Sequence, residues 1–268
     1  MNTLKSRLSV IVTLCFMCLT TASAWKIAPH KNAAATGGYN FMLYTPNEAE
    51  VKGHEPLPLI IFLHGASLQG TDLNRVERYG PLDAVHKGMD IPAYVMAPQC
   101  RGGWNAEKVM KTVEWVCQQC DVDSARIYVI GMSMGGYGSM DFASTYADKL
   151  AAAIGICGGV NKSIDPLATL PLWILHGTAD RPVPISCSER IVNRIKQINK
   201  GERLIFTRLP GINHGQPARL FYRHEMYEWL LEHRLTDEGR PVCRKYVLNN
   251  QSIQNAYRNL PGHGRNVR

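Results

Sequence analysis

The chain has 268 residues, of which 45% are hydrophobic, enough to bury the core of one large domain or two small ones. Lysine and arginine outnumber aspartate and glutamate by 30 to 22, which gives a formal net charge of +8. Much of the excess follows residue 236, where aromatic residues are not interleaved with the basic ones, so a nucleic-acid partner is not expected.

Residues 1–24 have the pattern of a secretory signal peptide. Two basic residues precede an apolar core from Leu8 to Leu19, and Ala22-Ser23-Ala24 is a cleavage site of small residues. The apolar core is short for a membrane span, and an uncleaved N-terminal anchor is the alternative. We therefore expect a secreted or periplasmic protein that begins at Trp25 and has no membrane span after cleavage.

Beyond residue 25 the chain alternates short apolar runs with segments of helical period. Apolar runs of this length without polar alternation are typical of strands buried on both faces. Strands are predicted at residues 41–46, 59–63, 92–97, 127–130, 150–157, 172–175 and 204–209. Helices are predicted at residues 81–87, 105–119, 137–146, 186–198 and 218–234, and residues 66–80 are predicted to form a long polar loop.

This alternation indicates an α/β protein with a mostly parallel central sheet and helices on both faces. No composition break or internal repeat divides it, and no large insertion offers a lid. We predict one domain over residues 25–236, followed by a basic C-terminal extension over residues 237–268. The extension is polar, and it is either an appended strand or loop pinned by Cys243 or a disordered segment.

Six of the eight cysteines follow the predicted signal peptide: Cys100, Cys117, Cys120, Cys157, Cys187 and Cys243. An even number in an exported protein permits disulfides, but the sequence does not choose among the pairings. The C-x-x-C pair at 117 and 120 has no second pair of ligands at the spacing of a zinc site. We interpret the cysteines as structural and expect no metal and no organic cofactor.

The stretch from Arg126 to Gly136 reads R-I-Y-V-I-G-M-S-M-G-G. Its apolar run stops at Gly131, and residues 131–135 then form the pattern G-x-S-x-G around Ser133. This pattern is typical of a nucleophile elbow, a sharp strand-to-helix turn that exposes a serine hydroxyl to a base. An ordinary glycine-rich turn is the alternative interpretation.

Two partners for this serine follow later strands. Asp180 lies just past the strand at 172–175, and His214 lies in the loop after the last strand. Functional loops collect at the carboxyl ends of parallel strands, so the three side chains are expected to meet. His214 would take the proton of Ser133, and Asp180 would orient the imidazole.

Other residues compete for these roles. Asp165 is the rival acid, but it follows no strand end, and the rival bases His224 and His233 lie in the final predicted helix. His64 and His176 both precede glycine at strand ends. We expect these two to make supporting hydrogen bonds rather than to act as bases.

An oxyanion hole needs two donors beside the serine. The backbone N–H of Met134 directly follows the nucleophile, and the N–H of Ala66, with Ser67 next in order, follows the strand at 59–63. Ser67 and Trp104 are candidate walls of a substrate pocket, although Trp104 could equally be plain packing.

Several blocks of the chain together resemble a known family. They are L-H-G-A-S-L-Q-G-T-D-L at 63–73, A-P-Q-C at 97–100, the elbow, H-G-T-A-D-R-P-V-P at 176–184 and N-H-G around residue 214. They are similar to exported α/β-hydrolases of the prolyl-oligopeptidase-like and phospholipase-carboxylesterase types, which resemble feruloyl and acetylxylan esterases. The resemblance covers about residues 40–235. One block departs from the family, because residues 64–70 read H-G-A-S-L-Q-G where H-G-A-G-E-R-G is usual.

The resemblance implies the α/β-hydrolase fold and a Ser133–Asp180–His214 triad. It implies a serine hydrolase whose substrate is a small-molecule or carbohydrate-linked carboxylic ester. An ester is favoured over a peptide because a serine triad without a separate gating domain handles the better leaving group more readily. A prolyl-oligopeptidase-type peptidase for short peptides and a non-catalytic binding protein are the alternatives, and no particular oligomeric state is indicated.

Overall fold

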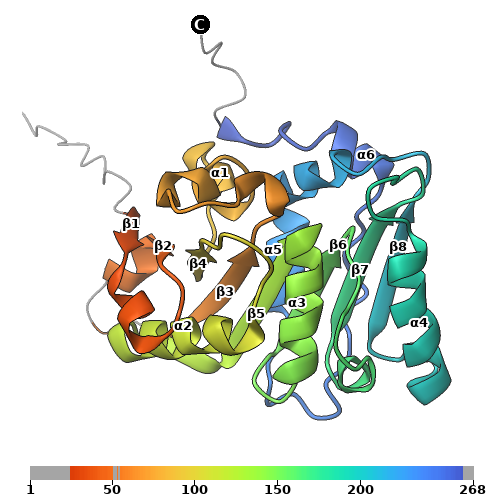
Figure 1. The fold of residues 1–268 in the computed structure, drawn as a ribbon, viewed down its shortest axis with the longest axis horizontal. Coiled ribbons are helices and arrows are strands. Elements are labelled where there is room, and N and C mark those ends of the chain that lie inside the picture. Colours follow the sequence, from red (N-terminus) through yellow and green to blue (C-terminus); the bar gives the residue numbers. More distant parts are fainter. Residues whose placement is uncertain (1–24, 51–52, 54, 262–268) are drawn as a thin grey trace, which may run out of the picture.

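The computed structural model describes residues 25–50, 53 and 55–261, and an eight-stranded sheet runs through this part of the chain (Figure 1). The strands are β1 (Lys26–His30), β2 (Phe41–Thr45), β3 (Leu57–Leu63), β4 (Tyr94–Pro98), β5 (Val122–Met132), β6 (Ala152–Ile156), β7 (Leu172–Gly177) and β8 (Leu204–Leu209). Their order is β1-β2-β4-β3-β5-β6-β7-β8. The pairs β1–β2 and β2–β4 are antiparallel and the others are parallel, so the predicted mostly parallel sheet is confirmed.

Strand β3 shows why the strands read as continuous apolar runs. Leu59, Ile61 and Leu63 pack into the hydrophobic cluster on one face of the sheet, and Ile60 and Phe62 pack into the cluster on the other face. Side chains alternate between the two faces along a strand. A strand covered on both sides therefore needs an apolar residue at every position.

Helices cover both faces of this sheet (Figure 1). They are α1 (Pro81–His86), α2 (Ala106–Gln119), α3 (Met134–Thr145), α4 (Ser186–Asn199), α5 (His224–Leu231) and α6 (Asn250–Gln254). Helices α2, α3 and α4 contribute to one cluster, and α1, α5 and α6 contribute to the other. The predicted start of α2 is confirmed, because the Oδ1 of Asn105 accepts a hydrogen bond from the backbone N–H of Lys108 at 2.9 Å.

The helix predicted over residues 218–234 is wrong in its first half. Gln216–Tyr222 form a 3-10 helix, Arg223 has an extended backbone (φ −112°, ψ 125°), and α5 begins at the next residue. The Arg223 guanidinium donates to Glu225 and to the backbone carbonyl of Asn255. The break thus coincides with a contact to the C-terminal segment that local periodicity does not reveal.

Two smaller differences occur earlier in the chain. Strand β1 was not predicted, because its sequence K-I-A-P-H lies at the sheet edge and mixes polar and apolar residues. The polar loop at 66–80 contains two 3-10 helices, Ala66–Leu68 and Leu73–Glu77. Asp72 caps the second one by accepting a hydrogen bond from the N–H of Asn74.

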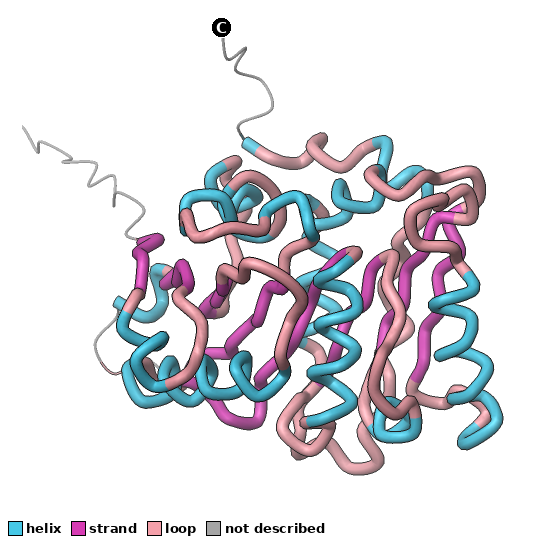
Figure 2. The backbone as a smooth tube through the Cα atoms, viewed as in Figure 1, coloured by secondary structure: helices cyan, strands magenta, loops and turns pink. Residues whose placement is uncertain are grey.

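The C-terminal segment packs against the core as far as residue 261. Its most buried apolar residues are Leu248, Ile253, Ala256 and Leu260. The indole N–H of Trp229 on α5 donates to the backbone carbonyl of Cys243 at 2.8 Å. The described part of the basic extension is therefore held by apolar contacts and hydrogen bonds, and α6 with the residues after it runs across the top of the molecule (Figures 1 and 2).

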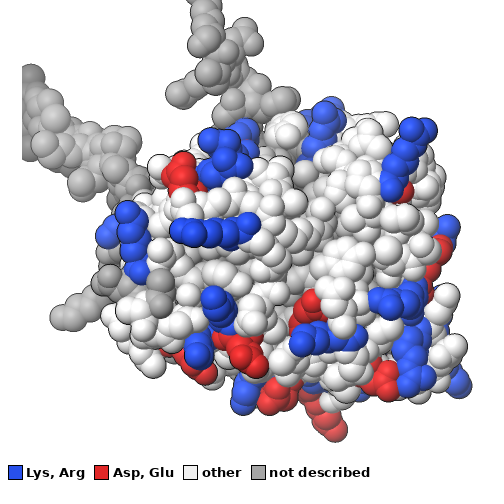
Figure 3. All heavy atoms as spheres, viewed as in Figure 1, with Lys and Arg blue, Asp and Glu red and all other residues white. Residues whose placement is uncertain are grey.

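The predicted signal peptide lies outside the described residues. Among the residues that are described, no helix combines the length and the apolar character needed to cross a membrane. Lysine and arginine are spread over the face seen in Figure 3 rather than gathered into one patch. The six cysteines of the described chain all carry free thiols, so none of the permitted disulfides joins them.

Candidate active site

Ser133 occupies a sharp turn between β5 and α3. Its backbone has φ 60° and ψ −122°, a left-handed conformation that costs a non-glycine residue free energy. Its N–H donates to the carbonyl of Ile156 on the neighbouring strand at 2.9 Å. A Cβ on Gly131 would stand 2.3 Å from the carbonyl oxygen of Gly135, so the two glycines of the pattern allow helix and strand to approach. The predicted strand-turn-helix is confirmed.

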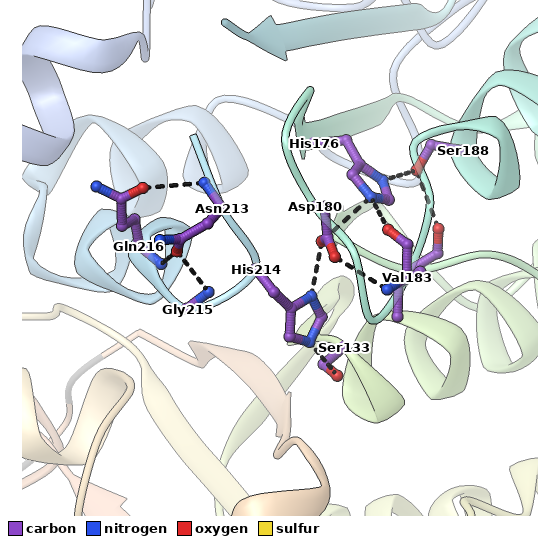
Figure 4. Close-up of polar contacts among 10 residues, drawn as sticks. Ser133, His176, Asp180, Val183, Ser188, Asn213, His214, Gly215 and Gln216 are labelled. Atoms are coloured by element: carbon purple, nitrogen blue, oxygen red, sulfur yellow. Dashed lines mark hydrogen bonds and ion pairs between the residues drawn. The ribbon is translucent and has the colours of Figure 1, made fainter. Parts of the chain in front are cut away.

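The structure brings Ser133, His214 and Asp180 into one hydrogen-bonded chain (Figure 4). The Nε2 of His214 lies 2.8 Å from the Oγ of Ser133, and its Nδ1 lies 2.6 Å from the Oδ2 of Asp180. The Asp180 carboxylate only accepts, so Nδ1 carries the proton and Nε2 presents a lone pair to the serine hydroxyl. In this arrangement the imidazole can take the hydroxyl proton while the carboxylate stabilises the resulting charge.

Loop contacts hold His214 in place. The Oδ1 of Asn213 accepts hydrogen bonds from the N–H groups of Gly215 and Gln216. The side-chain oxygen of Gln216 in turn accepts from the N–H of Asn213 at 2.9 Å. These bonds close a compact turn around His214 (Figure 4). The loop can therefore present the imidazole with little loss of conformational entropy.

The two backbone N–H groups expected to form an oxyanion hole each belong to the first residue of a helix. Met134 is the first residue of α3, and Ala66 is the first residue of the 3-10 helix after β3. The first N–H groups of a helix have no acceptor within the helix. Gly65, just before Ala66, donates to the hydroxyl of Tyr79 at 2.7 Å, which fixes the start of this turn.

The rival residues are engaged elsewhere. Asp165 is exposed and forms an ion pair with Arg194, and His224 begins α5. His233 is buried, with Nδ1 2.8 Å from the carbonyl of Trp229. His64 is also buried, and its Nδ1 lies 2.8 Å from the carbonyl of Gly65.

The chain is similar to several known proteins. Residues 101–219 match the model of the dienelactone hydrolase family. A solved structure of a thermostable esterase is similar to the chain, with 26% identity and a TM-score of 0.63 over 78% of this chain and 63% of that one. The chain has the α/β-hydrolase fold.

Two curated relatives match shorter stretches of this α/β-hydrolase. The probable acetylxylan esterase A of Aspergillus flavus is 31% identical over 81 residues, 30% of this chain and 23% of the relative. Acetylxylan esterase A of Emericella nidulans is 35% identical over 57 residues, 21% of this chain and 19% of the relative. The matched part thus spans about a fifth of each relative.

A hollow of about 410 Å³ lies along the first two turns of α3 and includes Met134, the residue after Ser133. Its lining comprises Gly103, Trp104, Met134, Tyr137, Gly138, Asp141 and Asn161. Trp104 forms part of this wall and is also packed, because its indole N–H donates to the carbonyl of His64 at 3.1 Å. Ser67 is not in the lining; it is exposed, and its carbonyl accepts a hydrogen bond from Arg75.

The sequence interpretation missed five of the seven lining residues, among them Tyr137, Asp141 and Asn161. Tyr137 and Asp141 project from the same side of α3 as Met134, since residues three, four and seven apart share a helix face. That spacing could have identified them once the elbow was located. Asn161 reaches the hollow from the loop after β6, and its N–H and side-chain amide both donate to Asp141. This loop contact leaves no sequence signal.

One group of potential metal ligands touches the site in the described part of the α/β-hydrolase. Ligand atoms of Cys157, His176 and Asp180 lie within 4.8 Å of one another, and all three residues are buried. Burial raises the pKa of the Cys157 thiol to about 12, and the thiolate is the form that binds metals. Asp180 also accepts hydrogen bonds from His214 and Val183. These properties suit a hydrogen-bond network better than a metal site.

Proposed function

We propose that the protein is a serine esterase that hydrolyses carboxylic esters through an acyl-enzyme on Ser133. The observation that carries the proposal is the hydrogen-bonded chain from Asp180 through His214 to Ser133 at a nucleophile elbow. The similarity to a thermostable esterase and to acetylxylan esterases supports an ester as the substrate.

The first half of the proposed reaction forms the acyl-enzyme. The Oγ of Ser133 attacks the carbonyl carbon of the ester while its proton passes to the Nε2 of His214. The negative charge that develops on the carbonyl oxygen is stabilised by the N–H groups of Met134 and Ala66. The bond to the alcohol oxygen then breaks, and His214 gives its proton to the departing alkoxide.

The second half repeats these steps with water. His214 accepts a proton from a water molecule, whose oxygen attacks the acyl carbon. The bond to Oγ breaks, the proton returns to Ser133, and the carboxylic acid leaves. Asp180 accepts the hydrogen bond of the His214 Nδ1–H throughout, with Oδ2 2.6 Å from Nδ1.

The hollow along α3 is the proposed place for one side of the ester. Trp104 and Tyr137 offer aromatic faces, and Asp141 and Asn161 offer polar groups. Aromatic surface combined with a few polar groups suits small organic or carbohydrate-linked esters. We also propose that residues 1–24 direct export, so that these substrates are met outside the cytoplasm.

Hydrolysis of p-nitrophenyl acetate and butyrate by the mature chain tests this function. We expect turnover by the wild type, and a loss of kcat of about 10⁴-fold or more in Ser133→Ala. Ser163→Ala is the matched control, because Ser163 is exposed and only its carbonyl accepts a hydrogen bond, from Ser144. A folded wild type without turnover, or a Ser133→Ala variant with full activity, would contradict the proposal. A parallel panel of short peptides would then test the peptidase alternative.

A further inference from the structure

A second histidine contacts the carboxylate of Asp180. The side chain of His176, near the end of β7, is fully buried, and its Nε2 lies 3.4 Å from the Oδ2 of Asp180. The same Nε2 lies 2.9 Å from the carbonyl oxygen of Val183. On its other side, Nδ1 lies 2.7 Å from the Oγ of Ser188 on α4 (Figure 4). The imidazole is therefore held between the acid loop and a helix.

The partners of His176 determine where its proton lies. Both oxygens near Nε2 can only accept hydrogen bonds, so Nε2 carries the proton. Burial lowers the pKa of His176, which favours the neutral imidazole. In that form Nδ1 accepts the single proton of the Ser188 hydroxyl, for which the carbonyl of Gly158, 3.0 Å from the same Oγ, is the competing acceptor. Ser188 thus contacts the imidazole from α4.

Val183 closes a small ring of contacts between the two residues. Its N–H donates to the Oδ1 of Asp180 at 2.9 Å, and its carbonyl accepts from His176. One oxygen of the carboxylate is thereby fixed by the backbone. The other oxygen lies 2.6 Å from the Nδ1 of His214 and 3.4 Å from the Nε2 of His176, and the Cys157 thiol also hydrogen-bonds the carboxylate. His176 is thus one of the groups that can orient the carboxylate toward His214.

We propose that His176 is a positioning residue for the hydrolysis. Its Nε2–H contacts the Asp180 carboxylate and the Val183 carbonyl and so keeps the carboxylate facing His214. Ser188 holds the imidazole on its other side, at Nδ1. This inference rests on the proposed function. His176, the first residue of the H-G-T-A-D block, then affects the rate of the reaction and not only the packing of the fold.

The consequence for His214 follows from the contacts of Asp180. A carboxylate that turns away stabilises less the positive charge that His214 gains when it takes the serine proton, so the reaction slows. The other titratable groups that face His176 are Asp180 on its own loop, Cys157 at the end of β6 and His214 on the loop after β8. None of these side chains is itself altered by a substitution at His176, so a change in the NMR signal of the His214 Nδ1–H reports the lost contact.

The test uses the mature protein with His176→Leu, His176→Gln and Ser188→Ala. In His176→Leu we expect kcat to fall about tenfold, with KM unchanged, because the Nε2 contacts with the Asp180 carboxylate and the Val183 carbonyl are both lost. The acid limb of the kcat profile should move to lower pH. His176→Gln, whose amide N–H can replace Nε2–H, should retain most of kcat and the wild-type acid limb. Ser188→Ala should give a smaller loss of kcat and a shift in the same direction.

A second readout does not need turnover. The low-field ¹H NMR signal of the His214 Nδ1–H, assigned with a His214→Gln variant, should move upfield in His176→Leu, because the contact with Asp180 loosens. A folded His176→Leu protein with an unchanged acid limb and an unchanged Nδ1–H signal overturns the inference. If that variant does not fold, Ser188→Ala is the deciding variant, because a wild-type kcat and a wild-type Nδ1–H signal in it also overturn the inference. Absence of turnover in the wild type contradicts the proposed function instead, and the NMR comparison still tests the contact.

Discussion

The carbonyl oxygen of Leu63 lies 1.7 Å from the place that a Cβ on Gly135 would occupy. The end of β3 and the first turn of α3 thus meet without room for a side chain. This approach brings Ala66, which follows β3, beside the turn that carries Ser133. The second glycine of the G-x-S-x-G pattern is therefore required by packing between two elements that are far apart in sequence.

Gly135→Ala is expected to destabilise the fold by about 3 kcal/mol or more, because backbone atoms rather than a flexible side chain must move. Urea denaturation of both proteins measures the difference. Gly102→Ala is the matched control, since a Cβ there meets nothing within 4 Å. Equal unfolding free energies for wild type and Gly135→Ala would show that β3 and α3 are not so close.

Stability is expected to fall below pH 6.5, partly through His233. Burial lowers the pKa of this histidine, and its Nε2 accepts a hydrogen bond from the N–H of Cys243 at 3.0 Å. Protonation in the folded state would break that bond. The unfolded chain therefore binds the proton first, and stability present above pH 6.5 is lost as the pH falls toward the folded-state pKa.

The measurement is the free energy of unfolding in urea between pH 7.5 and 5. His233→Gln should be less stable than the wild type at neutral pH but should lose less stability on acidification, by up to about 1.4 kcal/mol per pH unit. Parallel curves for the two proteins would show that His233 is not buried in its neutral form.

Trp104→Ala is expected to lower kcat/KM for a bulky ester such as methyl ferulate by about tenfold, the factor for 1.4 kcal/mol of lost contact. Hydrolysis of p-nitrophenyl acetate should change less, because a small acyl group needs less of the hollow. Trp104→Phe keeps a ring against Gly138 and is the control for packing. Equal losses on both esters would indicate a structural role alone.

The strands other than β1 and the order of the site residues were predictable because each leaves a local signal. Buried strands read as apolar runs, and Ser133, Asp180 and His214 each follow one. The helix boundary at Arg223 was not predictable, because it depends on contacts with Glu225 and Asn255. Such contacts form only after the chain has folded.

The residues that line the hollow were likewise not predictable from local sequence. Asp141 reads as an ordinary polar residue of a helix, yet it is buried and accepts hydrogen bonds from Asn161 and from the N–H of Lys162. The loop after β6 supplies these donors, and nothing in its sequence marks it as part of a pocket. The identity of the pocket wall therefore comes from tertiary structure, whereas that of the nucleophile comes from a motif.

Thiol titration tests the cysteine arrangement. Denatured mature protein prepared without reductant should titrate six thiols, because all six cysteines are free. In the native protein Cys100 and Cys157 should stay unmodified, since both are buried and burial raises the pKa of each to about 12. Mass spectrometry of native protein treated with iodoacetamide would locate the modified residues. Four or fewer thiols after denaturation would reveal a disulfide, and early labelling of Cys157 would show that the network behind Asp180 is open to solvent.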